Sequence, residues 1–173
     1  MYYWDVFTNI DDYLEYYSMD RIDNKILNLL QENGELSTAE IAEAVGLSTT
    51  PCWRRIQRME KEGIIANRVV LLDRAKLNLG IDVFVAVKTN QHNLEWLADF
   101  SDTVSRFSEV VEFYRMAGES DYLLRVVVPD IPAFDKFYKK LVQSTGLADV
   151  SSSFAMEQIK FTTALPLDYV QTA

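Results

Sequence analysis

The stretch Gly-Leu-Ser-Thr-Thr-Pro-Cys-Trp-Arg-Arg-Ile-Gln-Arg-Met-Glu, residues 46–60, decides the fold because it predicts the turn and second helix of a helix-turn-helix. Gly46 can adopt the left-handed conformation that ends a helix, and the hydroxyl of Ser48 is suited to cap the next one. Pro51 then falls in the first turn, where a missing N–H costs little. We therefore expect a helix to begin just after Ser48.

The expected helix has an apolar face and a basic face. Cys52, Ile56 and Met59 recur at i, i+4 and i+7, and Trp53 pairs with Ile56 at i+3, so this side is predicted to pack inward. The arginines at positions 54, 55 and 58 are predicted to point the other way. Guanidinium groups bind phosphates or guanine edges, and short hydroxyls at the helix start permit close approach to DNA. For an isolated helix a solvated amphipathic surface would be the simpler interpretation.

Two further helices precede this one and favour the DNA-reading interpretation. Apolar residues at helical spacing predict a helix over 20–32, which Gly34 ends. Residues 37–40, Ser-Thr-Ala-Glu, form a capping box that starts a second helix, and Gly46 stops it. Three short helices with a tight glycine-containing turn make a trihelical DNA-binding unit. Residues 68–72 are predicted to form a strand that leaves this domain.

The periodicity changes from 3.6 to 2 in the second half of the chain. Alternating residues predict a strand over 81–88, followed by a helix over 93–107 and two strands, 110–116 and 122–128, joined by a short loop. Pro132 is predicted to open a helix that Gly146 ends, and residues 150–161 form the last strand. The order βαββαβ is that of a ferredoxin-like fold, an antiparallel sheet with two helices on one face. The other face needs cover, and a second copy is the simplest cover.

The predicted fold class is therefore α+β, with a trihelical, winged-helix-like domain followed by a ferredoxin-like sensor domain. The predicted layout is an N-terminal extension (1–18), a helix-turn-helix domain (19–66), a hinge strand and connector (67–80), a ligand-sensing and oligomerisation domain (81–165) and a C-terminal tail (166–173). The extension, rich in aromatic and acidic residues, could be a misassigned start, a disordered tail or a segment that docks on a partner subunit.

Composition limits the class of protein. The 173 residues carry a net charge of −9, which at first argues against nucleic acid, but four of the six bases within 20–66 lie on the expected third helix. A local basic face on an acidic body can therefore bind DNA.

No apolar run is long enough to span a membrane and no export signal is evident, so we expect a cytoplasmic protein without a membrane partner. With only Cys52 and His92 available, neither a disulfide, a metal site nor a cofactor is expected, and His92 is expected at the surface.

Several motifs together resemble the leucine-responsive regulatory protein/AsnC (Lrp/AsnC, feast/famine) family. They are residues 19–27, 46–58 with their Pro-Cys pair, 62–65, 109–124 and 152–154, and the resemblance covers about residues 19–168. It implies a transcription regulator that binds DNA as a dimer, assembles further into tetramers or octamers, and responds to amino acids bound between dimers. It also implies the DNA-binding residues Ser48, Thr49, Thr50, Pro51, Cys52, Arg54, Arg55 and Arg58. The effector-binding residues it implies are Met116, Gly118, Glu119, Asp121, Tyr122 and Ser153.

The implied effector segment also has a physical basis. Gly118 would let a ligand approach the backbone, loop N–H groups could bind a carboxylate, and Glu119 or Asp121 could pair with an α-ammonium group. Met116 and Ser153 are expected as neighbours on adjoining strands. Without the resemblance, a plain hairpin loop would be the simpler interpretation. Trp53, where other members often have leucine, together with Phe-Tyr-Arg-Met at residues 113–116 makes the chain look closest to regulators of sulfur amino-acid breakdown, so cysteine is one candidate effector.

The leading hypothesis is a sequence-specific transcription regulator that binds double-stranded DNA at a roughly palindromic operator, with an affinity coupled to an amino acid. One alternative is an architectural protein that compacts DNA without a specific signal. Another is a dimeric ferredoxin-like enzyme. The enzyme alternative is disfavoured because the sequence has no nucleophile–base pair at persuasive spacing and no phosphate-binding glycine loop.

Overall fold

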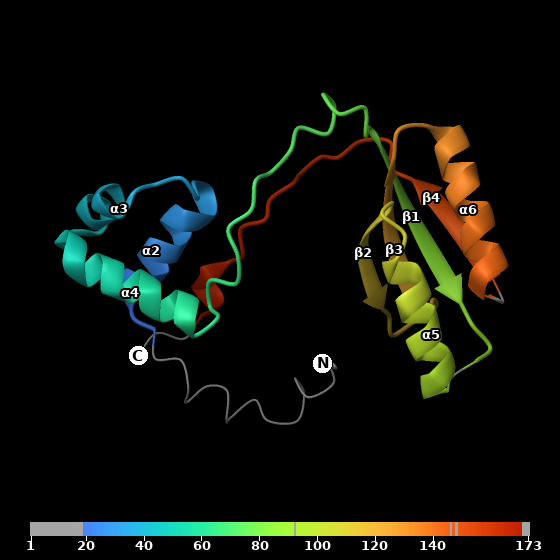
Figure 1. The fold of residues 1–173 in the computed structure, drawn as a ribbon, viewed down its shortest axis with the longest axis horizontal. Helices are drawn as coiled ribbons and strands as arrows, with labels where there is room; N and C mark the ends of the chain where they lie inside the picture. The colour runs from blue at the N-terminus through green and yellow to red at the C-terminus, as the bar shows by residue number, and fades with distance from the viewer. Residues whose placement is uncertain (1–18, 92, 146, 148, 171–173) are drawn as a thin grey trace. The chain divides into compact units, whose positions relative to one another are not determined.

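The computed structural model describes residues 19–91, 93–145, 147 and 149–170. The chain divides into two compact units, one formed by residues up to Val70 together with those from Phe161, and the other by Leu71–Lys160 (Figure 1). The predictions for the N-terminal extension, His92 and the helix end at Gly146 lie outside the described residues. No described helix is long and apolar enough to cross a membrane.

The described α-helices of the first unit are α2 (Arg21–Glu32), α3 (Thr38–Val45) and α4 (Thr49–Lys61). Asp20 caps α2 by accepting hydrogen bonds from the N–H groups of Ile22 and Asp23, and the Asp23 carboxylate accepts from the Asp20 N–H in return. The helix ends at Glu32 with Asn33 as its cap, one residue before the predicted Gly34. The core of the unit consists of Met19, Ile26, Leu27, Ile41, Ala42, Cys52, Ile56 and Met59.

The turn between α3 and α4 confirms the predicted helix-turn-helix, with one correction. Gly46 has φ 74° and ends α3 in the left-handed conformation, and Ser37 and Glu40 form the predicted capping box. Ser48 occupies the N-cap position of α4, but its hydroxyl makes no capping hydrogen bond. A cap bonds the second or third N–H of the helix, and Pro51, the third residue of α4, has none, which leaves only the N–H of Thr50 for such a bond.

The predicted strand at residues 68–72 is wrong. This segment pairs with no strand among the described residues, and all five of its residues are exposed, including the apolar Val69, Val70, Leu71 and Leu72. An apolar segment with β-branched residues forms a strand only where another strand offers backbone hydrogen-bond partners. The segment is therefore an unpaired, apolar linker.

The second unit has the predicted βαββαβ order. Its elements are β1 (Ile81–Lys88), α5 (Leu94–Ser105), β2 (Val110–Arg115), β3 (Tyr122–Val128), α6 (Ile131–Thr145) and β4 (Asp149–Phe154). The strands form one antiparallel sheet in the order β2-β3-β1-β4 (Figure 1). Both helices pack on one face, where the core is Val83, Val85, Val87, Phe100, Val104, Tyr122, Leu124, Val126, Val128, Phe134, Phe137 and Leu141. On the other face, Phe84 is exposed.

The last strand is shorter than predicted, and the chain beyond it returns to the first unit. β4 ends at Phe154 rather than at residue 161, and the following segment exposes Met156 and Ile159. A short 3₁₀ helix, Leu167–Tyr169, then packs against the core of the first unit. The side chain of Gln31 in α2 bonds both backbone groups of Leu165, at 2.6 Å from its N–H and 3.3 Å from its carbonyl. Leu167 and Val170, predicted to lie in a C-terminal tail, therefore pack on the first unit.

Candidate DNA-binding helix and effector loop

Helix α4 buries the predicted apolar stripe but not all of the predicted residues. Cys52, Ile56 and Met59 are buried, whereas Trp53 is 51% exposed, contrary to the prediction that it packs inward. The three buried residues already fill the side that faces α2 and α3, and Trp53 lies a further 100° around the helix from Cys52. The exposed residues of α4 are Thr49, Thr50, Pro51, Trp53, Arg54, Gln57 and Lys61.

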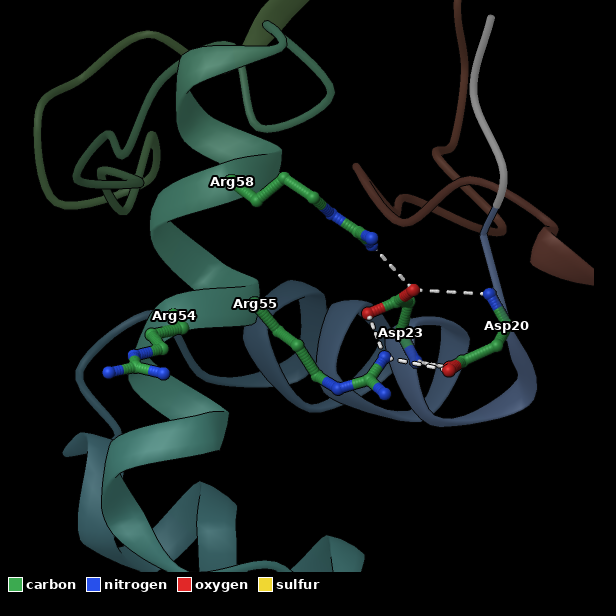
Figure 2. A pocket seen from close by; sticks show the side chains of 5 residues that line it. All are labelled: Asp20, Asp23, Arg54, Arg55 and Arg58. Carbon is green, nitrogen blue, oxygen red and sulfur yellow. Dashed lines mark hydrogen bonds and ion pairs between the residues drawn. The ribbon is translucent and has the colours of Figure 1, made fainter. Parts of the chain in front are cut away.

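Two of the three arginines on α4 are turned toward α2, contrary to the prediction that all point outward. Arg55 Nη1 donates to Asp20 Oδ2 at 2.7 Å and to Asp23 Oδ1 at 2.8 Å, and Arg58 Nη2 donates to Asp23 Oδ2 at 2.6 Å. Figure 2 shows Asp23 between the two guanidinium groups, while Arg54 points away from the acids. These five residues line a hollow of about 350 Å³. Arg54 is therefore the arginine most available to a ligand.

Asp23 is the centre of this cluster. Its side chain is only 1% exposed, whereas those of Arg55 and Arg58 are 28% and 39% exposed. A buried carboxylate is tolerated only when opposite charges and hydrogen bonds satisfy it, and here both oxygens are bonded. The cluster thus ties α4 to the start of α2 and restricts where the helix and its arginines can point.

Two members of the cluster, Asp20 and Arg55, have pKa values shifted in the direction that favours their charged forms. Burial raises the pKa of the Asp20 carboxyl, but hydrogen bonds from the Asp23 N–H, from Arg55 and from the Ile22 N–H outweigh it, so the net pKa lies below the ordinary value. The hydrogen bond to Asp23 raises the pKa of Arg55 above its ordinary value, despite the opposing effect of burial. The ion pair between Asp20 and Arg55 is therefore present at neutral pH.

Cys52 has no exposed surface. Burial raises the pKa of its thiol above the ordinary value, although the charge of Arg55 partly opposes this. Its backbone N–H donates to the Ser48 carbonyl. The side chain, expected among the DNA-binding residues, is thus a packing group that does not reach the surface of α4.

The predicted effector loop contains a hollow of about 230 Å³. It is lined by Met116, Ala117, Gly118, Glu119, Ser120 and Leu123. Gly118 has φ 149°, a conformation that side chains disfavour. Within the described residues, no acceptor bonds the N–H groups of Gly118, Glu119 and Ser120. The loop therefore offers free backbone donors beside an apolar wall.

Asp121 holds this loop to the end of β1. Its carboxylate accepts from the Thr89 N–H at 2.8 Å, and its own N–H donates to the Val87 carbonyl at 3.0 Å. Glu119, by contrast, has a side chain that is 92% exposed and lies 3.6 Å from Lys88. Of the two acids expected to bind an α-ammonium group, Glu119 is the more available, while Asp121 shapes the loop.

Two other residues expected at the effector site lie elsewhere. Tyr122 is buried, and its ring packs against those of Trp96, Phe100 and Phe113, so burial raises the pKa of its hydroxyl. Ser153, expected beside the effector segment, lies on β4, at the opposite edge of the sheet from β2. Three strand spacings separate these edges, roughly 14 Å.

Sequence reasoning missed the role of Asp23, although a signal for it exists. Asp23 precedes Ile26 by three residues and Leu30 by seven, so an acid occupies the apolar stripe of α2. An acid on a buried stripe needs a cation from another element, and α4 carries three.

No cluster of three or more candidate metal ligands occurs in the part of the chain that the structure describes.

Comparison with protein families accounts for both units. Residues 19–66 match the Winged helix-turn-helix DNA-binding family, and residues 82–165 match the Lrp/AsnC ligand binding domain. The chain is 53% identical over 151 residues to the DNA-binding transcriptional activator DecR of Escherichia coli (strain K12), covering 87% of this chain and 99% of that protein. It is 48% identical over 149 residues to the Glutamate uptake regulatory protein of Zymomonas mobilis, covering 86% and 91%. These relatives are transcription regulators, which argues against the enzyme alternative.

Solved structures agree with this fold. An AsnC family transcriptional regulator from Agrobacterium tumefaciens superimposes with a TM-score of 0.87 at 61% identity, covering 88% of this chain and all of that chain. A transcriptional regulator from Neisseria meningitidis, solved as a complex with L-Met, superimposes with a TM-score of 0.84 at 37% identity and covers 88% of this chain and 99% of that one.

Proposed function

The chain belongs to the Lrp/AsnC family of DNA-binding transcription regulators, and from that premise we propose that an amino acid bound at the loop of residues 116–121 controls its affinity for a specific operator. The proposal has three parts, which concern the DNA contact, the effector and the assembly of copies. Each part rests on a different set of side chains, so each can be tested separately.

For the DNA contact, α4 enters the major groove with its exposed face. Arg54 is free of the acidic cluster and carries the direct contact to a guanine edge or a phosphate. The side chains of Arg55 and Arg58 remain 28% and 39% exposed, and guanidinium N–H groups that are not bonded to the acids contact phosphates. The short side chains at the helix start, those of Ser48, Thr49, Thr50 and Pro51, leave room for the DNA backbone.

For the effector, the observation that carries the proposal is the hollow lined by Met116 and Leu123 beside the free N–H groups of residues 118–120. These donors suit an α-carboxylate, and the exposed carboxylate of Glu119 suits an α-ammonium group. The apolar wall suits an aliphatic or sulfur-containing side chain. The related regulator solved with L-Met supports an amino acid of the sulfur class.

For the assembly, two observations support copies that meet at the sensor unit. The sheet face opposite the helices exposes Phe84, so a second sheet can cover it. Ser153 and the effector loop lie at opposite edges of one sheet, so a site that uses both requires Ser153 from another copy. Two copies related by a twofold axis present two α4 helices to successive major grooves, which predicts a roughly palindromic operator.

The effector is tested by thermal shift with each of the twenty amino acids. A ligand that binds only the folded protein raises the melting temperature, so methionine or cysteine is expected to do so. Glu119→Gln should weaken that response, because it removes the charge that faces the α-ammonium group. Since the Glu119 side chain is exposed, the substitution removes no core contact. Glu95→Gln, an exposed acid on α5, is the matched control.

Gel-shift titrations of the same proteins then connect the ligand to DNA. The amino acid that raises the melting temperature should change the operator affinity of the wild-type protein and of Glu95→Gln. It should change the operator affinity of Glu119→Gln less. If none of the twenty changes the melting temperature, the oligomer size or the DNA affinity, the effector part of the proposal is wrong.

A further inference from the structure

Helix α4 carries one large apolar side chain that the core of the unit does not use. Trp53 is 51% exposed, although tryptophan is normally among the more buried residues. Among the described residues it has no aromatic, hydrogen-bonding or ionic partner. Trp96, by contrast, is stacked on Phe100 at a centroid distance of 4.9 Å. Folding of the unit therefore does not explain the exposed indole.

The indole lies within a stripe of exposed residues along α4. Thr50, Trp53, Arg54, Gln57 and Lys61 follow the spacing i, i+3, i+4, i+7 and i+11, which places them on one side of the helix. The buried stripe faces the core instead. The outward stripe thus combines a hydroxyl, an indole, a guanidinium group, an amide and an ammonium group.

Duplex DNA is the occupant that fits this mixture. The two cations of the stripe complement phosphates and base acceptors, and the acid at its edge, Glu60, is paired with Arg68 at 3.1 Å. A protein surface would match the indole, but it would leave the arginine and lysine without the anions that DNA supplies in a regular array. The stripe also begins at the start of α4, the end of a recognition helix that contacts base edges.

The major groove offers one apolar group on its base edges, the C5 methyl of thymine. The indole presents an apolar face to such a methyl and has an N–H that can donate to a neighbouring base acceptor. We propose that Trp53 is a specificity-determining residue that packs against thymine methyl groups in the major groove. This inference rests on the proposed placement of α4 in that groove, and it adds a contact that Arg54 and the hydroxyls do not supply.

The test begins with duplexes that the wild-type protein enriches from a random pool. In the enriched duplex, each thymine is replaced in turn by deoxyuridine, which lacks the methyl group. At one or two positions in each half-site, the replacement should weaken binding by the wild-type protein by about fourfold, the equivalent of one buried methyl group. The same replacements should have no effect on Trp53→Ala, because the indole is absent.

The variant itself should lose affinity selectively. Trp53→Ala should bind the enriched duplex about tenfold or more weakly, while its affinity for a random-sequence duplex at the same salt concentration stays within about twofold of wild type. Its melting temperature should not fall, since the indole is exposed. Leu94→Ala, which truncates an 82% exposed side chain in the second unit, is the matched control and should change none of these quantities.

The outcomes separate this inference from the proposed function. If the wild-type protein enriches no sequence, the proposed sequence-specific function fails. If it enriches a sequence but tolerates deoxyuridine everywhere, the thymine contact is refuted. Equal losses of affinity for enriched and random duplexes would make Trp53 a nonspecific contact and overturn its role in specificity.

Discussion

Replacing Asp23 by asparagine should destabilise the DNA-binding unit more than any other isosteric change of an acid within it. The carboxylate is 1% exposed and accepts from Arg55 at 2.8 Å, from Arg58 at 2.6 Å and from the Asp20 N–H at 3.1 Å. An asparagine keeps one acceptor oxygen, but its NH₂ group then faces one of the two guanidinium groups. One charged contact is lost, and the other becomes a bond to a neutral acceptor.

The magnitude follows from the burial of the partners. Breaking a fully buried ion pair costs about 3–5 kcal/mol, and a hydrogen bond to a charged group contributes about 1.5–3 kcal/mol. Here Arg55 and Arg58 are 28% and 39% exposed, so water recovers part of the loss. We expect the free energy of unfolding to fall by about 2–3 kcal/mol. In a small domain this lowers the melting temperature by roughly 10–20 °C.

Urea unfolding followed by circular dichroism at 222 nm measures the change, with Glu43→Gln on the exposed side of α3 as the matched control. A double-mutant cycle of Asp23→Asn with Arg55→Gln should give a coupling energy of at least about 1 kcal/mol. A loss below about 0.5 kcal/mol in Asp23→Asn, or a coupling near zero, would refute the assignment of Asp23 as the centre of the cluster.

Three further predictions concern neighbouring residues. Arg54→Ala should weaken operator binding in gel shifts and leave the melting temperature unchanged. Arg58→Ala should weaken operator binding and, in addition, lower the free energy of unfolding by about 1–2 kcal/mol. Equal melting temperatures for the two variants would contradict this prediction. Cys52, buried and with a raised pKa, should resist a disulfide reagent such as DTNB at pH 7.5 until urea unfolds the unit, and rapid native labelling would disprove its burial. The lowered pKa of Asp20 should make its stabilisation fully present above its ordinary value of 3.8 and lost as pH falls through the lower pKa of the folded state. Urea midpoints between pH 5 and 2.5 should therefore fall less steeply in Asp20→Asn than in wild type.

Local chemistry determined most of the fold. Several features of the first unit depend only on residues within one or two helical turns of each other. They are the capping box at Ser37, the left-handed conformation of Gly46, and the spacing of the buried residues Cys52, Ile56 and Met59. The alternating strands and the connections between them likewise predict the βαββαβ order, because each depends on residues close together in the chain. The family resemblance follows from the same local motifs.

The candidate sites were less accessible to sequence reasoning. The arginines of α4 and the glycine loop were identified, but their partners were not, because Asp23 and Arg55 lie 32 residues apart. Similarly, strand order decides whether Ser153 can approach the loop, and residue spacing says nothing of strand order. The predicted strand at residues 68–72 failed for a related reason, since its propensity is local but its hydrogen-bond partner must come from elsewhere.

By itself, then, the sequence determined most of the helices and strands, most of the side chains that form the two cores, and that α4 is the basic helix of a helix-turn-helix. Only the tertiary structure decided that Trp53 faces outward, that a buried acid holds Arg55 and Arg58 but not Arg54, and that the Gln31 side chain bonds Leu165, 134 residues away. The physical reason is that periodicity records one residue's relation to its own element. The direction of a charged side chain depends on which opposite charge the packed elements bring within hydrogen-bonding distance.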